Sequence, residues 1–295
     1  MNRSEGLHVA VLGIGLLGPG LADWASSAAL LRDPTAWQRQ PTVIPPPARL
    51  PATERRRAGN VVNASIVVAD QACTMAALDP ARLASVFTSS TGDPTNCHLL
   101  CEALAAPERM VSPTRFTNSV HNAAAGYWHI ATQSRAPSTS LAAFDASFGA
   151  GLLEAAVQSL ASGQPVLLVA CDVPYPEPLH SLRPLADSFA VALVLAPVQP
   201  GSPAPWLVIQ SGARAEPTHC DHAGLNALRS DNPAACVLPL LQALARALTN
   251  GGPADLVIEG QPGQALRVQV GVRVEVEAQA QLDNQAQVKP PRTGA

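Results

Sequence analysis

Continuous apolar runs, separated by stretches with helical spacing, constrain the fold of this chain more than any other feature. Residues 8–17, 165–171 and 189–195 contain almost no polar side chains. Strands of this composition are buried on both faces, as in a parallel sheet covered by helices on either side. Residues 53–75 and 146–162 have the apolar spacing of long helices that pack on such a sheet. The sequence therefore predicts a layered α/β fold around a parallel sheet.

Shorter segments predict the remaining elements. Strands are expected over residues 84–89, 138–144, 206–211, 255–259 and 266–274, and helices over residues 21–31, 96–106, 120–132 and 234–248. The prolines of residues 34–51 predict an extended loop, because proline blocks both helix and ladder hydrogen bonds. Thr53 is the expected N-cap of the long helix that follows. Residues 213–232 show no clear pattern.

Composition excludes several classes of function. The chain has 295 residues, of which 47% are apolar and 14% charged, so it can bury a large core. A net charge of −3 leaves no basic excess for nucleic acid. No apolar run approaches the roughly 20 residues that cross a bilayer. The six scattered cysteines are typical of reduced thiols, so we expect a cytoplasmic protein.

Gly13, Gly15 and Gly18 follow the first predicted strand in the order of a dinucleotide-binding turn. An acid such as Asp33 should then end a second strand, but it follows a helical stretch instead. Pro19 also places another turn where the phosphate-binding helix should begin. The alternative is that these glycines serve a tight strand-to-helix turn, and no cofactor is expected.

Other polar motifs do not complete a site. Residues 97–101 and 219–222 contain cysteine and histidine, but neither segment has the ligand spacing of a zinc site, so no metal is expected. Ser147 and Cys171 are possible nucleophiles. A serine nucleophile needs a base and an oxyanion hole, and Ser147 does not lie in the Gly-x-Ser-x-Gly motif that presents one.

Five segments, taken in order, resemble β-ketoacyl synthases. They are residues 9–20 (VAVLGIGLLGPG), 55–57 (RRR, leading into an Ala-rich helix), 112–126 (SPTRFTNSVHNAAAG), 137–147 (PSTSLAAFDAS) and 183–195 (RPLADSFAVALVL). The resemblance covers about residues 7–200. It implies a thiolase-like layered α/β fold that works as a dimer. Its complete first half would occupy residues 1–200, a reduced second half residues 201–277, and a mobile tail residues 278–295.

The departures from this family concern catalysis. The resemblance places Asp145 where active synthases carry a nucleophilic cysteine, at a strand-to-helix junction. A carboxylate is favourable at a helix N-terminus but cannot form a thioester. Active synthases also carry two histidines in their second half. The corresponding strand here reads DLVIEGQPG over residues 255–263, and the last histidine of the chain is His222.

A retained fold without this chemistry resembles chain-length-factor-type subunits, the catalytically silent partners of ketosynthases. Residues 117–128 (TNSVHNAAAGYW) look closest to the ketosynthase-like subunits of aryl polyene pigment pathways. The resemblance implies a heterodimer with an active ketosynthase, which helps wall the acyl-chain tunnel and meets the acyl carrier protein through the complex. An acyltransferase with a displaced nucleophile, Ser147 or Cys171, remains an alternative. So does a nucleotide-binding oxidoreductase that uses the glycine turn.

Aromatic residues concentrate in the segments that would face the partner. Five of the eleven aromatics lie within residues 116–148. The expected interface and tunnel residues are Phe116, Asn118, His121, Asn122, Tyr127, Trp128, Phe144 and Phe148. The alternative for the aromatics is that they fill this chain's own core.

Overall fold

β1 (Leu7–Leu17) runs through the middle of an eight-stranded sheet. The structure is a computed structural model that describes residues 6–249, 252–260 and 264–272. The strand order is β3-β2-β4-β5-β1-β6-β8-β7. The other strands are β2 (Ala84–Thr88), β3 (Ser138–Leu141), β4 (Val166–Asp172), β5 (Phe189–Pro197), β6 (Trp206–Ala213), β7 (Ala254–Ile258) and β8 (Ala265–Gly271). The predicted tail, residues 278–295, and the end of the predicted strand 266–274 lie outside the described residues.

The sheet is mixed, so the prediction of a parallel sheet is wrong. β2 is parallel to β3 and β4. β5 is antiparallel to both of its neighbours, β4 and β1, and β6, β8 and β7 continue the antiparallel pattern on the other side of β1. Every residue of β4 and eight of the nine residues of β5 are buried. A continuous apolar run therefore indicates that a strand is buried on both faces. It does not indicate whether the strand is parallel or antiparallel to its neighbours.

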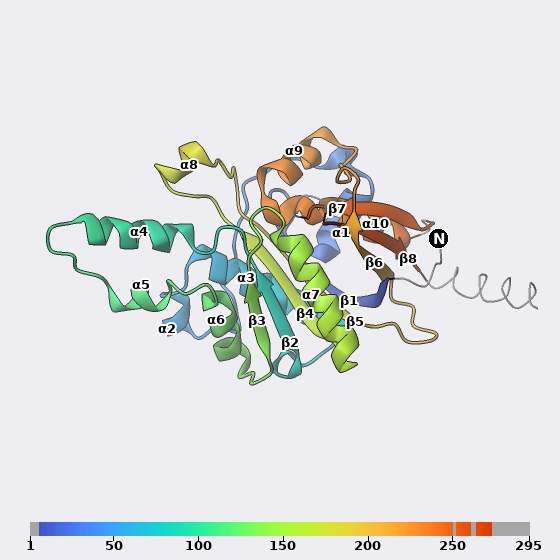
Figure 1. The fold of residues 1–295 in the computed structure, drawn as a ribbon, viewed down its shortest axis with the longest axis horizontal. Coiled ribbons are helices and arrows are strands. Elements are labelled where there is room, and N and C mark those ends of the chain that lie inside the picture. The colour runs from blue at the N-terminus through green and yellow to red at the C-terminus, as the bar shows by residue number, and fades with distance from the viewer. Residues whose placement is uncertain (1–5, 250–251, 261–263, 273–295) are drawn as a thin grey trace, which may run out of the picture.

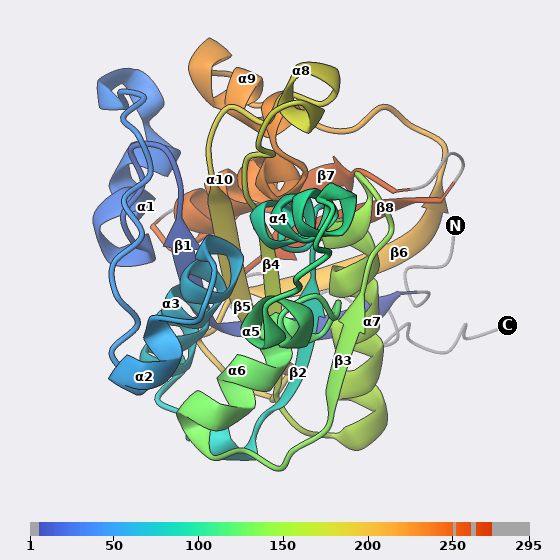
Figure 2. The same ribbon diagram turned by 90° about the vertical axis from the view of Figure 1, so that its left-hand side faces the viewer.

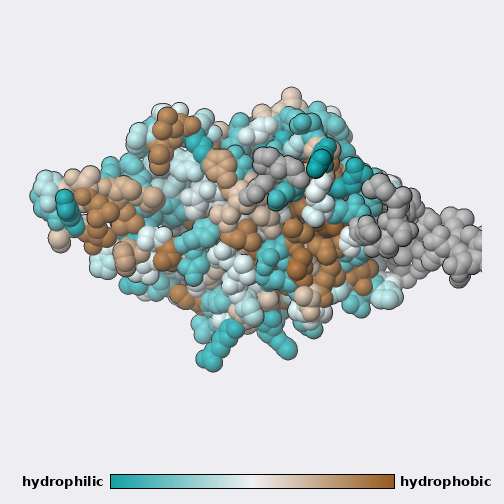
Figure 3. Space-filling view, viewed as in Figure 1, coloured by the Kyte–Doolittle hydropathy of each residue, from teal (hydrophilic) through white to brown (hydrophobic). Residues whose placement is uncertain are grey.

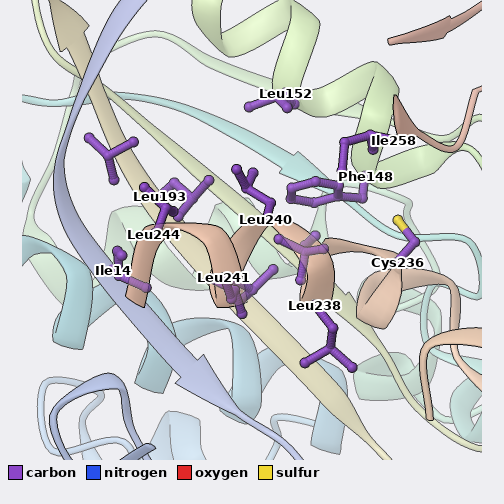
Figure 4. Close-up of a cluster of buried hydrophobic side chains, with 14 of the residues drawn as sticks. Ile14, Phe148, Leu152, Leu193, Cys236, Leu238, Leu240, Leu241, Leu244 and Ile258 are labelled. Atoms are coloured by element: carbon purple, nitrogen blue, oxygen red, sulfur yellow. The ribbon is translucent and has the colours of Figure 1, made fainter. Parts of the chain in front are cut away.

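Helices cover both faces of the sheet (Figures 1 and 2). They are α1 (Trp24–Arg32), α2 (Ala52–Arg55), α3 (Asn60–Ala76), α4 (Pro94–Ala105), α5 (Pro113–Thr117), α6 (Ala123–Thr132), α7 (Ser147–Ser162), α8 (Leu179–Leu182), α9 (Ala223–Asp231) and α10 (Leu238–Ala247). Alternate residues of β4 divide between two cores. Leu167 packs with α3 and α6 on one face, whereas Leu168 packs with α7 and α10 on the other. Figure 4 shows the second core, where Phe148 of α7 lies beside Ile258.

The long helix predicted from residue 53 is divided. α2 ends at Arg55, and α3 begins after Gly59. A side chain at Gly59 would place its Cβ 2.3 Å from Oδ2 of Asp93, so a larger residue there would require this carboxylate to move. Thr53 lies inside α2 and is not an N-cap. α9 occupies part of the segment for which the sequence showed no pattern.

Gly13 and Gly15 lie within β1 and not in a turn, which corrects both interpretations of the glycine motif. A Cβ on Gly13 would lie 2.1 Å from the carbonyl oxygen of Ala72, and a Cβ on Gly15 1.9 Å from that of Val68. The two glycines therefore let the buried helix α3 lie directly on the strand. This packing leaves no room for a pyrophosphate.

None of the helices in the described residues is long and apolar enough to cross a membrane.

Candidate functional site

The strand-to-helix junction before α7 is a tight turn over residues 142–146. Phe144 has a φ of +54°, a left-handed conformation that bulky residues rarely adopt. The hydroxyl of Ser147 holds this turn, because its Oγ donates to the carbonyl of Phe144 (2.6 Å) and accepts from the backbone N–H of Ala143 (3.0 Å). Thr88 of β2 donates its hydroxyl to the carbonyl of Ser147 (2.8 Å) and ties the start of α7 to the sheet.

Asp145 forms an ion pair with Arg183, a residue in the connection between α8 and β5. Its carboxylate does not cap α7, whose N-cap residue is Ala146 with no side-chain hydrogen bond. The Arg183 guanidinium also donates to Oγ of Ser90 (2.8 Å) and lies 3.9 Å from the centroid of the Phe144 ring. Sequence reasoning singled out Asp145 but missed its partner, because an ion pair across 38 residues leaves no local pattern.

The two alternative nucleophiles are not activated. Ser147 is 2% exposed, and both of its hydroxyl hydrogen bonds go to the main chain. Cys171 is 1% exposed on β4, and burial raises the pKa of its thiol far above the ordinary value. A buried neutral thiol and a serine without a base are both poor nucleophiles.

A cavity of about 320 Å³ opens beside the junction. Its walls combine the loop of residues 89–92, the start of α4 and residues 118–124. Asn118 and His121, two of the predicted interface residues, line it. Asn118 is fixed in place, because its amide donates to the carbonyl of Arg57 (2.8 Å) and its Oδ1 accepts from the hydroxyl of Tyr127 (3.0 Å).

Asp172, at the end of β4, organises this cavity and was missed in the sequence. Its Oδ1 accepts hydrogen bonds from Oγ of Ser89 (2.9 Å) and from the backbone N–H groups of Ser90 (2.7 Å) and Thr91 (3.0 Å). Burial nevertheless raises the pKa of the Asp172 carboxyl, which is 1% exposed. A lone acid that ends an otherwise apolar strand was the signal that could have revealed it.

The predicted interface residues divide into two groups. Phe116 (70%) and Phe144 (64%) are exposed, as are His121 and Asn122. Asn118 and three aromatics are buried; the aromatics are Tyr127, Trp128 and Phe148.

Trp128 and Phe148 favour the alternative interpretation, in which these aromatics fill this chain's own core. Both are fully buried, on opposite faces of the sheet, in this chain's own cores. Tyr127 packs in the same core as Trp128. The reason is the placement of their helices: α6 packs against α3 and β2, and α7 packs on the other face of the sheet, against β4 and the short helix over Pro233–Val237.

A second charged pair also lies near the first turn of α7. Glu259 directly follows β7. It belongs to the segment, residues 255–263, that the resemblance matches to a histidine-bearing segment of active synthases. Its carboxylate pairs with Arg229 of α9 (2.9 Å), which is 5% exposed. The carbonyl of Glu259 also lies against Gly149 in the first turn of α7, where a Cβ would come within 2.3 Å of it. Two ion pairs therefore lie close to the start of this helix.

Metal-ligating side chains do not converge in the part of the chain that the structure describes, where no group of three or more is found. Cys97 and Cys101 are exposed on α4, and His98 between them pairs with Glu102 (3.2 Å). His222 caps α9, because its Nδ1 accepts from the backbone N–H of Leu225 (3.4 Å). Both cysteine–histidine segments thus have structural explanations.

The comparisons with known proteins agree with this architecture. Residues 24–250 match the family model described as β-ketoacyl synthase, N-terminal domain. The match spans well over half of the chain, so this protein belongs to that family. No curated protein matches the sequence.

Solved structures share the fold at low identity. A chain of the complex of the ketosynthase ApeO with its chain length factor ApeC, from Xenorhabdus doucetiae, has a TM-score of 0.66 and 21% identity, over 90% of this chain and 99% of that one. The ishigamide ketosynthase/chain length factor gives a TM-score of 0.63 and 13% identity, covering 90% and 99%. The AntDE:AntF complex, an acyl-carrier protein with its ketosynthase, gives 0.70 and 13%, covering 91% and 100%. The fold is therefore the thiolase-like fold of ketosynthases.

Proposed function

We propose that this chain is a non-catalytic, chain-length-factor-type subunit that pairs with an active β-ketoacyl-ACP synthase. The heterodimer would elongate acyl chains of the polyene, polyketide or fatty-acid type, with the aryl polyene type the closest resemblance. The observation that carries this proposal is the junction before α7, where Asp145 lies and is engaged by Arg183. A carboxylate held in an ion pair cannot accept an acyl group from a carrier thioester and release it again to a condensing carbanion.

The rest of the site supports a silent role. The carboxylate of Glu259 pairs with the buried Arg229. Unlike the histidine of active synthases, it cannot donate an imidazole N–H hydrogen bond to a thioester carbonyl. Ser147 is committed to the backbone of the turn. With the nucleophile and the histidines both replaced, this chain can contribute walls and contacts to a reaction but no covalent step.

The proposal assigns the cavity to the wall of the tunnel that holds the growing acyl chain. Apolar residues line part of it, among them Val61, Phe87 and Val120. The exposed rings of Phe116 and Phe144 would contact the partner near its mouth. Hydrophobic residues gather on this side of the molecule over α4 and α8 (Figure 3). The proposal places the complex in the cytoplasm, with the acyl carrier protein as its substrate carrier, and requires no cofactor.

Co-expression with an active ketosynthase of the same pathway tests the proposal. The expected product is a one-to-one heterodimer by native mass spectrometry that condenses malonyl units only when both chains are present. Mutation of the ketosynthase's own nucleophile should abolish condensation, whereas Asp145→Ala in this chain should not. A homodimer that ignores the ketosynthase would contradict the proposal.

The alternative acyltransferase is tested on the isolated chain. Incubation with an acyl-carrier thioester, followed by intact-mass analysis, should leave the chain unlabelled. An acyl adduct that disappears in Ser147→Ala or Cys171→Ala would establish a displaced nucleophile and refute the silent role.

A further inference from the structure

Arg183 connects three segments that meet at the junction. Its guanidinium donates to the carboxylate of Asp145 in the turn before α7 and to the hydroxyl of Ser90 in the loop after β2. The same group covers the ring of Phe144 at 3.9 Å and lies 5.9 Å from the ring of Tyr175. The Arg183 side chain therefore connects the turn of residues 142–146, the loop of residues 89–92 that lines the cavity, and the segment after β4.

Phe144 is the residue on which these contacts act. It combines a left-handed backbone with a ring that is 64% exposed. The isolated chain gains little from such an arrangement, because a bulky residue at positive φ is strained and an exposed ring leaves apolar surface in water. Strain that is held in place from two sides, by Arg183 above the ring and by Ser147 at the carbonyl, indicates a functional position.

The charges of Asp145 and Arg183 also suit a surface that a partner protein covers. The side chain of Asp145 is 59% exposed and that of Arg183 25%. A partner that covered a lone carboxylate would leave it without water or a counter-charge, which is costly. Because Arg183 already pairs with Asp145, the turn presents its aromatic ring beside a neutralised pair. A planar guanidinium can stack on the ring and bind the carboxylate at the same time, which a lysine ammonium cannot do.

We propose that Arg183 is a positioning residue that holds the Phe144 ring outward as an anchor for an apolar pocket on the partner ketosynthase. This inference rests on the proposed function and names the group by which the silent junction takes part in the complex. The turn that corresponds to the nucleophile turn of active relatives becomes a recognition element here, through the residue that precedes Asp145.

The test is a double-mutant cycle on the dissociation constant of the heterodimer, measured by calorimetry. Phe144→Ala and Arg183→Ala should each weaken binding about tenfold or more, as is usual for aromatic anchors. The double variant should bind like Phe144→Ala alone, because Arg183 acts through the ring. Val43→Ala truncates an apolar side chain that is even more exposed (78%), in the proline-rich loop of residues 34–51, and should leave binding unchanged.

Each outcome decides the question. Unchanged binding by Phe144→Ala, or losses that simply add in the double variant, would overturn the positioning role while the heterodimer itself stands. A wild-type chain that binds no ketosynthase would instead remove the proposed function. Should Arg183→Ala fail to fold by circular dichroism, Arg183→Lys keeps the charge, loses the stacking, and completes the same cycle with the same expected non-additivity.

Discussion

Gly15→Ala tests the close packing of α3 on β1. The added Cβ would lie 1.9 Å from the carbonyl oxygen and 2.7 Å from the carbonyl carbon of Val68. Both atoms belong to the backbone of α3, so no side-chain rotation can relieve the contact. The helix must move by more than an ångström to restore a van der Waals distance.

The energetic cost follows from how α3 is buried. Ten of its seventeen residues are buried, and it packs against β1, β4 and β5. Moving such a helix opens gaps along all three strands. Overpacking in a core typically costs about 1–3 kcal/mol. We expect the upper end of that range, about 3 kcal/mol, because the obstacle is backbone.

Urea denaturation followed by circular dichroism measures the loss as a change in midpoint at constant slope. Gly126→Ala is the matched control, because Gly126 lies in α6 and a Cβ there meets nothing within 4 Å. That variant should be more stable than wild type by about 0.5–1 kcal/mol. If Gly15→Ala were as stable as Gly126→Ala, the close contact of α3 with β1 would be refuted.

Three further predictions concern the site. Asp145→Cys in the isolated chain should show no condensing activity in a malonyl-carrier assay, because no histidine accompanies the new thiol; any turnover would refute our view of the second half. Phe116→Asp should change the free energy of unfolding by less than about 0.5 kcal/mol, since the ring is exposed, yet weaken ketosynthase binding about tenfold by burying an unpaired charge; unchanged co-purification would remove residue 116 from the interface. Burial raises the pKa of Asp172 above its ordinary value of 3.8, so its contribution to stability is complete below pH 3.8 and is lost as pH rises through the folded-state pKa. Asp172→Asn, which cannot ionise, should gain stability relative to wild type over that interval in urea titrations at successive pH values, and parallel curves would contradict this.

The elements of this fold were largely predictable because burial leaves a periodic pattern. The strands at residues 166–172 and 189–197 and the helix at residues 147–162 lie within a few residues of their expected positions. Strand direction was not predictable, since β5 is antiparallel to both neighbours and yet as apolar as a parallel strand. The glycines of β1 were misread because a glycine needed for close packing looks the same as one needed for a turn.

The site was predictable only where the chain is contiguous. The junction at Asp145 follows from the order strand, turn, helix in one segment. Arg183 and Asp172 join it only through the folded sheet, so their roles had no local signature. For the aromatics, the concentration was visible in the sequence, but the direction of each side chain was not. Which rings point outward depends on how α6 and α7 are placed against the sheet. Trp128 is buried, whereas Phe144 is exposed.

The position of β1 has a consequence for how the chain can be divided. The strand pairs along its length with β5 and, at its beginning, with β6, so the segments before and after residue 200 share one ladder. Leu193 of β5, Leu207 of β6 and Leu241 of α10 also meet in one core. A cut near residue 200 would not release two modules, and exchanging the second half for that of an active ketosynthase would have to rebuild β1's ladder as well. The chain should melt in one transition, with the amide hydrogens of β1 among the last to exchange.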